Sequence, residues 1–299
     1  MNKKLLLGIV LVFLGACSYG VLATLVKLAY KEGFSFNEVT SSQYLTGFLV
    51  LSILSFFFKD KTKKTQKNKK KSILQLIAAG TSLGLTGIFY YLSLRYIPVS
   101  IAIIMLIQST WLGVLAEAIL KKRLPSIKKM IVSLTICGAT ILAAGIFDQT
   151  VEFHFIGFLL GFLAAISYTV TIIASANIGL EMHSIHRSFW LSMGGTIIVL
   201  IVTATQWNGV YNVEIFYKWG LLLALFGTIL PPILFAYGMP YTGIGLGTIL
   251  GAIELPVSVL FASVLLHENL DPLRWTGVLI ILTSILVMNI NKNKKKHDI

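Results

Sequence analysis

Long apolar runs separated by short polar segments recur along the whole 299-residue chain. A helix needs roughly 20 predominantly apolar residues to cross about 30 Å of hydrocarbon. We predict ten such spans, at approximately 5–26, 39–58, 73–94, 99–120, 128–147, 154–176, 188–206, 219–239, 245–266 and 273–290. Because the connecting segments are short, we expect successive helices to lie antiparallel beside each other.

The second half of the sequence repeats the first. Tyr19 matches Tyr168 at an offset of 149 positions, and Tyr91 matches Tyr237 at an offset of 146. Each copy holds five predicted spans, and because five is odd, the second copy must enter the membrane from the opposite side. Inverted repeats of helices are the architecture of secondary transporters. Transport is therefore the leading hypothesis before any motif is considered.

The copies occupy residues 1–147 and 154–299, with the boundary at Asp148–Phe153 and a basic tail at the C-terminus. Composition agrees with a membrane protein, because only 12% of the residues are charged and 56% are hydrophobic, whereas about 25% of a soluble domain is charged.

The net charge of +13 is distributed unevenly. Of the 25 basic residues, 20 fall in segments on one side of the predicted membrane, among them the run Lys59–Lys71 and Arg187. By the positive-inside rule, we expect both termini to be cytoplasmic. We also expect a multi-pass protein of the plasma membrane, the inner membrane in a bacterium. We expect the basic run to bind anionic lipid headgroups, and this charge placement argues against nucleic acid as a partner.

Motifs for hydrolysis, cofactors or metals are missing from the sequence. It contains no phosphate-binding Gly-Lys-Ser/Thr loop, no zinc-binding His-Glu-x-x-His and no nucleophile elbow, so we expect neither an enzyme nor a cofactor. His183 and His186 have a weak metal-like spacing without a third ligand. Cys17 follows a sequence similar to a lipoprotein cleavage box, but the apolar run continues to Val26, which favours an uncleaved first helix.

Glu254 is the sharpest single signal for a binding site. It lies about ten residues into the ninth predicted span, near the bilayer centre. A carboxyl at that depth is expensive and almost always faces a cavity or the bundle interior. Pro256 follows two residues later and frees a backbone carbonyl. A carboxyl beside an interrupted helix is a common way to build a transporter site.

The repeat maps Glu254 onto Gln108 in the fourth span. Two related polar positions on pseudo-symmetric helices are expected to face one central cavity. Because burial disfavours the charged form of a carboxyl, protons are a candidate coupling ion. The alternative is that Glu254 makes one interhelical hydrogen bond and never contacts substrate.

Further candidates come from helix-breaking residues and from aromatic residues within spans. The consecutive prolines Pro231 and Pro232 cannot both sit in an unbroken helix interior, and Gly84 and Gly87 relax the backbone in the corresponding region of the first copy. A hinge in both copies is one hypothesis, and a static kink is the other. Tyrosine and tryptophan offer an apolar face with a polar tip. Side chains expected to line the cavity are Tyr19, Tyr90, Tyr91, Trp111, Tyr168 and Tyr237, with Ser18 and Gln43.

Other charged and small residues have simpler explanations. Lys27 ends the first span, where it either extends to the headgroups or attracts anions at the cavity mouth. Glu117 lies four residues before Lys121, which predicts an ion pair on one helix face. The small-residue spacing of Gly80 and Gly84 indicates close helix packing.

Two stretches carry a resemblance to a known family. The first is Tyr90-Tyr91-Leu92-Ser93-Leu94-Arg95-Tyr96-Ile97-Pro98-Val99-Ser100-Ile101-Ala102. The second is Glu254-Leu255-Pro256, the small-residue run to Ala262, Glu268-Asn269-Leu270 and Trp275-Thr276-Gly277. The chain resembles the EamA-like branch of the drug/metabolite transporter superfamily. This resemblance implies ten helices as two inverted five-helix repeats, a central cavity and export or exchange of small metabolites.

The chain departs from the family pattern at three places. Arg123 precedes Leu124 where the family often has an acidic residue, and Gln43 stands where relatives often place an arginine. The proline of the fourth helix is replaced by Thr110, so we expect only the second copy to keep its helix interruption.

These observations predict an all-α integral membrane protein that works as a secondary transporter, an exporter or exchanger. A mid-membrane carboxyl without a basic partner favours a small cationic or zwitterionic metabolite, such as an amino acid or amine. Alternating access would operate around the cavity near Glu254 and Gln108. Two alternatives stay open, namely a membrane-embedded enzyme that acts on a lipid and a scaffold that transports nothing.

Overall fold

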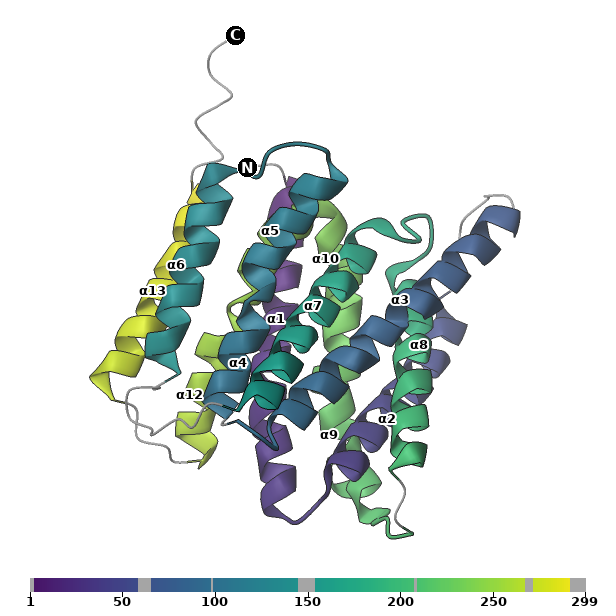
Figure 1. Ribbon diagram of the computed structural model, residues 1–299. Helices are drawn as coiled ribbons and strands as arrows, with labels where there is room; N and C mark the ends of the chain where they lie inside the picture. The colour runs from purple at the N-terminus through teal and green to yellow at the C-terminus, as the bar shows by residue number, and fades with distance from the viewer. Residues whose placement is uncertain are drawn as a thin grey trace.

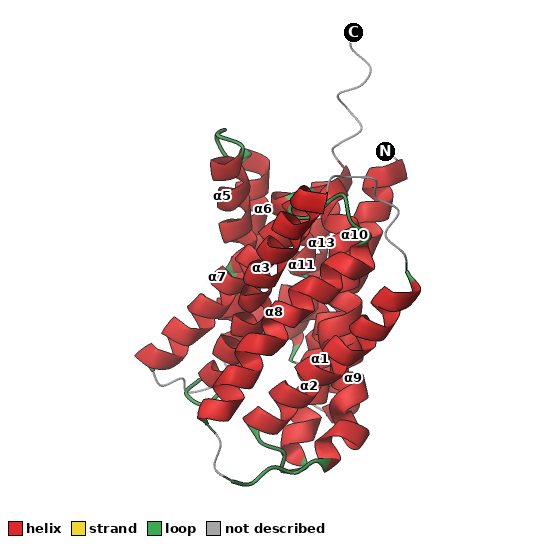
Figure 2. Ribbon diagram, turned by 90° about the vertical axis from the view of Figure 1, so that its right-hand side faces the viewer, coloured by secondary structure: helices red, strands yellow, loops and turns green. Residues whose placement is uncertain are grey.

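The computed structural model describes residues 3–58, 66–97, 99–144, 154–206, 209–266 and 271–290. Within these ranges the regular structure is entirely helical, as predicted (Figure 2). The helices run side by side along one elongated bundle (Figure 1). α1 begins and α13 ends at the same end of that bundle.

The helices follow the predicted spans in order. The first copy contains α1 (Lys3–Lys31), α2 (Phe36–Phe57), α3 (Gln66–Ser93), α4 (Val99–Ile107), α5 (Ser109–Leu120) and α6 (Ile127–Ala143). The second copy contains α7 (Phe155–Asn177), α8 (Ser184–Thr205), η2 (Phe216–Gly220), α9 (Leu221–Ala224), η3 (Leu225–Ile229), α10 (Leu230–Thr242), α11 (Ile244–Gly251), α12 (Glu254–Leu266) and α13 (Pro272–Ile290). The elements η2 and η3 are short π-helical segments within one long span.

Within the described ranges, eight helical stretches are long and apolar enough to cross a membrane. They correspond to eight of the ten predicted spans, so the chain is a multi-pass membrane protein. The fifth and tenth predicted spans correspond to α6, with 17 residues, and α13, whose apolar part is Pro272–Met288. These two shorter helices pack against each other. The count of ten spans and the orientation of the termini stay predictions.

Helices that follow one another in sequence are not the main packing partners. α1 packs chiefly on α10 and α12, and α3 packs on α7 and α8, whereas the contact between α1 and α2 is slight. The expectation that short loops make successive helices neighbours was therefore wrong. The apolar faces of one copy are covered by helices of the other, so the two copies interlock.

Glycines allow the closest of these contacts. A Cβ atom added at Gly80 of α3 would lie 2.0 Å from the carbonyl oxygen of Leu191, and one added at Gly194 of α8 would lie 1.9 Å from that of Ile77. The two helix backbones therefore touch, which small residues permit at membrane helix interfaces. Close packing is thus what Gly80 and its neighbour Gly84 provide.

Arg187 is buried in the first turn of α8, only 4% exposed. The sequence places Arg187 directly before the predicted span 188–206, whereas α8 begins four residues before that span, at Ser184, and includes Arg187. The side chain is tolerated there because its guanidinium donates hydrogen bonds to three backbone carbonyls. A buried charge requires such partners.

Some predicted features lie outside the described residues. These are residues 59–65 of the basic run, the boundary Asp148–Phe153, the turn Glu268–Leu270 and the tail 291–299.

Candidate functional site

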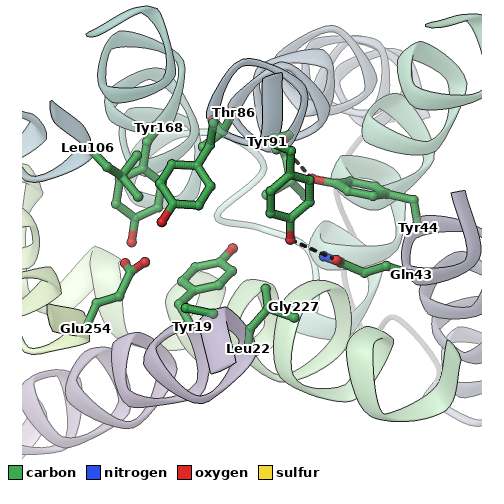
Figure 3. Close-up of a pocket in the computed structure, with 14 residues that line it drawn as sticks. Tyr19, Leu22, Gln43, Tyr44, Thr86, Tyr91, Leu106, Tyr168, Gly227 and Glu254 are labelled. Atoms are coloured by element: carbon green, nitrogen blue, oxygen red, sulfur yellow. Dashed lines mark hydrogen bonds between the residues drawn. The ribbon is translucent and has the colours of Figure 1, made fainter. Parts of the chain in front are cut away.

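A cavity of about 70 Å³ lies where the two copies meet (Figure 3). The first copy contributes α1, α2, α3 and α4 to its wall, and the second contributes α7, η3 and α12. The lining residues are Tyr19, Leu22, Ala23, Gln43, Tyr44, Leu83, Thr86, Gly87, Tyr90, Tyr91, Leu106, Tyr168, Gly227 and Glu254. Most of this wall is aromatic or aliphatic, with one carboxyl.

Glu254 enters the cavity from a break between two helices. α11 ends at Gly251 and α12 begins at Glu254, and the amide of Ile253 donates to the Leu250 carbonyl three residues back, at 3.2 Å. Pro256, in the first turn of α12, has no amide hydrogen to continue an earlier helix. The carboxyl points into the cavity (Figure 3). Within the described part of the chain, no side chain forms a hydrogen bond or ion pair with it.

Two tyrosines at equivalent positions in the repeats flank this carboxyl. The rings of Tyr19 and Tyr168 meet edge to face with their centroids 6.0 Å apart. Their hydroxyl groups and the carboxyl of Glu254 converge on the same space (Figure 3). The Tyr168 hydroxyl is buried without a hydrogen-bond partner among the described residues. Buried polar groups normally have partners, so this end of the cavity presents polar groups that a ligand could satisfy.

The opposite wall is held by hydrogen bonds within the protein. The Tyr91 hydroxyl donates to the Gln43 side-chain oxygen at 3.3 Å, and the Tyr44 hydroxyl donates to the Leu83 carbonyl at 2.7 Å. The Thr228 hydroxyl donates to the backbone carbonyl of Gln43 at 3.0 Å. This wall is therefore a fixed surface, in contrast to the end that holds Glu254.

Four predicted lining residues lie away from this cavity. Gln108 donates to the Ile104 carbonyl at 3.1 Å and accepts from the indole of Trp111 at 2.8 Å. Ser18 donates to the carbonyl of Phe226 at 2.9 Å, between α1 and η3. Tyr237 shares a hydrogen bond of 2.9 Å with a ring nitrogen of His183. A binding role for these residues stays a prediction.

Gln108 nevertheless marks a second helix break. α4 ends at Ile107 and α5 begins at Ser109, so the first copy is interrupted at the position that matches Glu254. The expectation that Thr110 removes this interruption was wrong. The backbone amide of Gln108 donates to the carbonyl of Met105, and its side-chain amide donates to the carbonyl of Ile104. The Thr110 hydroxyl caps the Ile107 carbonyl at 2.9 Å. Side-chain donors thus satisfy two backbone carbonyls beside this break.

The predicted hinge residues differ between the copies. Pro231 and Pro232 stand in the first turn of α10, directly after the π-helical segment η3. Prolines fit in that turn because its amides have no partner in their own helix. Gly84 lies within the unbroken helix α3, where an added Cβ would come 2.6 Å from the carbonyl oxygen of Gly195. Gly87 lines the cavity near the Tyr44 hydroxyl. Motion at any of these positions stays a prediction.

Several lining residues were missed by the sequence analysis, including Ala23, Tyr44 and Thr86. Ala23 follows Tyr19 by four residues, and Thr86 precedes Tyr90 by four. Residues four apart lie on one face of a helix. Helical spacing from the predicted tyrosines could therefore have identified these two.

A route leads from this cavity to one end of the bundle. A second cavity, of about 370 Å³, shares Ala23, Tyr90 and Tyr91 with the first and is also lined by Lys27 and Arg95. A third, of about 570 Å³, shares Phe36 and Arg95 with the second and reaches the start of α2. With the predicted orientation, this is the outer end.

The opposite side of the Glu254 cavity is filled by a packed core. Val12 and Ala16 of α1, Phe235 and Met239 of α10, and Ile249 of α11 are all at most 1% exposed. Close packing of this kind leaves few voids larger than a water molecule. The cavity therefore adjoins open space toward one end and solid packing toward the other.

Ionic contacts tie helices together at that packed end. The Glu117 carboxylate forms the predicted ion pair with Lys121, at 2.7 Å, and a second one with Lys129 of α6. A Cβ added at Gly245 would collide with this carboxylate, which shows that it touches the start of α11. Glu117 thereby links α5, α6 and α11.

Comparison with known proteins agrees with this architecture. One solved crystal structure, described only as that of a protein, matches with a TM-score of 0.74 and 15% sequence identity, over 93% of this chain and 98% of that chain. At this identity, the match shows the fold alone. A search of curated proteins gives no match. The family model of the EamA-like transporter family matches residues 6–144 and 155–290, one copy in each repeat. The chain therefore belongs to the EamA-like transporter family of the drug/metabolite transporter superfamily, a family of small-molecule transporters.

Proposed function

We propose that the protein is a secondary transporter of a small cationic or zwitterionic organic metabolite, such as an amino acid or amine, in the plasma membrane. The observation that carries this proposal is the Glu254 carboxyl, which enters a tyrosine-lined cavity from a helix break and has no partner among the described residues. A carboxylate with aromatic faces around it favours an ammonium group.

The difference between the two sides of the cavity supports transport by alternating access. Open space adjoins it toward the Lys27 end, and the core around Phe235 fills the other side. Rocking of one repeat against the other would open the packed side and close the open one. The pseudo-symmetric helix breaks at Gln108 and Glu254 are natural points for this rearrangement, and the direction is export or exchange.

Counterflow in proteoliposomes tests the proposal. Vesicles loaded with an unlabelled amine or amino acid should take up the labelled compound, and Glu254→Gln should lower the initial rate at least tenfold. Glu214→Gln is the matched control, because Glu214 is an exposed surface carboxylate paired with Lys218. The absence of counterflow across a panel of amines and amino acids would refute the proposal, as would full activity of Glu254→Gln.

Proton coupling is tested in the same vesicles with an imposed pH gradient. If Glu254 exchanges a proton during the cycle, Glu254→Gln should transport independently of that gradient. A variant rate that keeps the full pH dependence of the wild type would exclude Glu254 as the proton carrier.

A further inference from the structure

Two basic side chains line the route between the Glu254 cavity and the outer end of the bundle. Lys27 of α1 and Arg95, which follows α3, both line the second cavity, whose described lining contains no acidic residue. The Arg95 guanidinium lies over the ring of Phe36, 5.6 Å from its centroid. A carboxyl therefore stands at the deep end of this route, and two basic side chains stand nearer to its mouth.

The distance between Glu254 and Lys27 can be judged from α1, which passes both residues. The backbone of Glu254 touches α1 at Gly20, where an added Cβ would lie 2.6 Å from the Glu254 carbonyl oxygen. Lys27 is seven residues further along the same helix. At 1.5 Å per residue this is about 10 Å along the helix axis. A molecule that contacts both Glu254 and Lys27 must bridge roughly this distance.

The deep cavity accommodates only one end of a ligand. Its volume of about 70 Å³ corresponds to roughly five water-sized sites, at 10–15 Å³ each. This is room for an ammonium group and a few methylenes. The remainder of a longer molecule would extend past Tyr90 and Tyr91 into the second cavity, which has about 370 Å³.

The chemistry of the deep end fits an ammonium group. Tyr19 and Tyr168 place aromatic rings beside the carboxylate of Glu254 (Figure 3), and aromatic faces attract cations. The Tyr168 hydroxyl, buried and without a partner among the described residues, can accept a hydrogen bond from the same group. No basic side chain lines this cavity in the described part of the chain.

We propose that the transported molecule is an elongated amino carboxylate, whose ammonium group binds at Glu254 while its carboxylate binds between Lys27 and Arg95. This inference rests on the proposed transport function and specifies its substrate class. A charged hydrogen bond of about 2.8 Å at each end leaves roughly 4 to 5 Å between the nitrogen and the carboxylate of the bound molecule, which is about four bonds at about 1.2 Å per bond in an extended chain. An ω-amino acid, or an amino acid with a terminal side-chain amine, meets this requirement. A simple α-amino acid has only two bonds between these atoms and is shorter than this.

Binding of 6-aminohexanoate and hexylamine to the purified full-length protein tests the proposal, since the two probes share the amine and chain length and differ in the carboxylate. We expect 6-aminohexanoate to bind roughly tenfold more tightly than hexylamine, as one additional ion pair in a partly desolvated site allows. Shortening the amino acid to glycine should abolish this gain. Lys27→Gln and Arg95→Gln should each reduce the gain and leave hexylamine affinity unchanged, which also shows that the variants are folded. Lys218→Gln, a surface change of the same charge, is the control.

The outcomes separate this inference from the function on which it rests. If hexylamine binds and 6-aminohexanoate binds no more tightly, the elongated-substrate inference is overturned and the transport proposal stands. The same holds if affinity is independent of chain length or of Lys27 and Arg95. If neither probe binds and no amine or amino acid shows counterflow, the proposed function itself fails.

Discussion

Arg187 gives a specific test of how the packed end is held together, because its guanidinium donates hydrogen bonds to backbone carbonyls that lack an amide donor in their own helix. Its guanidinium donates to the carbonyls of Ser175 and Ile178, at 2.5 and 2.9 Å, near the end of α7. The last carbonyls of a helix have no amide partners within it. The third bond, of 2.5 Å, goes to Ala236 of α10. The amide that would satisfy Ala236 belongs to residue 240, which is a proline.

The magnitude follows from this geometry. Arg187→Met leaves two buried carbonyls and one partly buried carbonyl without this donor, at about 1–3 kcal/mol for each buried one, and regains part of this by removing a buried charge. We expect a net loss of about 2–5 kcal/mol in the free energy of unfolding. Pro240→Ala supplies an amide to Ala236 from within α10. In that background, Arg187→Met should therefore be less destabilising by about 1–3 kcal/mol.

The assay is a double-mutant cycle on the purified protein in mixed micelles. Unfolding by SDS is followed through the fluorescence of the five tryptophans. Pro272→Ala is the control proline, because Pro272 stands at the first position of α13 and frees no carbonyl there. Its coupling to Arg187 should be near zero. A coupling below about 0.5 kcal/mol between Arg187 and Pro240 would refute the carbonyl argument, because independent sites already add within that margin.

Three further predictions concern packing, the ion cluster and the cavity. Gly194→Ala should lower the free energy of unfolding by about 1–3 kcal/mol because the added Cβ meets a carbonyl of α3, whereas the control Gly138→Ala, with open space around it, should raise it by up to about 1 kcal/mol. If both variants change the melting temperature equally, the packing argument is wrong. Glu117→Gln should destabilise by about 1–3 kcal/mol, since it takes a charge partner from half-buried Lys129, and an unchanged melting temperature would argue against a structural role. Tyr168→Phe should leave the melting temperature unchanged or raise it, because it removes a buried hydroxyl that has no partner among the described residues, and it should weaken amine binding measured by calorimetry. An unchanged affinity would show that this hydroxyl does not contact the amine.

Residue type and depth within a span predicted several residues that line the Glu254 cavity. Tyr19 and Tyr168 were predicted to line a cavity because they are aromatic residues within spans, and the structure brings their rings together beside Glu254. The repeat match of Gln108 to Glu254 predicted a shared cavity, but Gln108 does not line the cavity that holds Glu254. Its side-chain amide accepts a hydrogen bond from Trp111 and donates one to the carbonyl of Ile104. Sequence matching cannot reveal such local hydrogen bonds.

The sequence by itself determined that this is a helical membrane protein built from two related copies, because apolar run length and internal matches are local properties of the chain. It also located the carboxyl at Glu254. Only the tertiary structure decided which helices pack together, since short loops suggested α2 as the neighbour of α1 while apolar surface and glycine contacts selected α10 and α12. The burial of Arg187 was likewise decided in three dimensions, because its partners come from α7 and from a carbonyl that Pro240 leaves free. Side-chain hydrogen bonds between distant segments depend on packing, and no pattern along one chain specifies them.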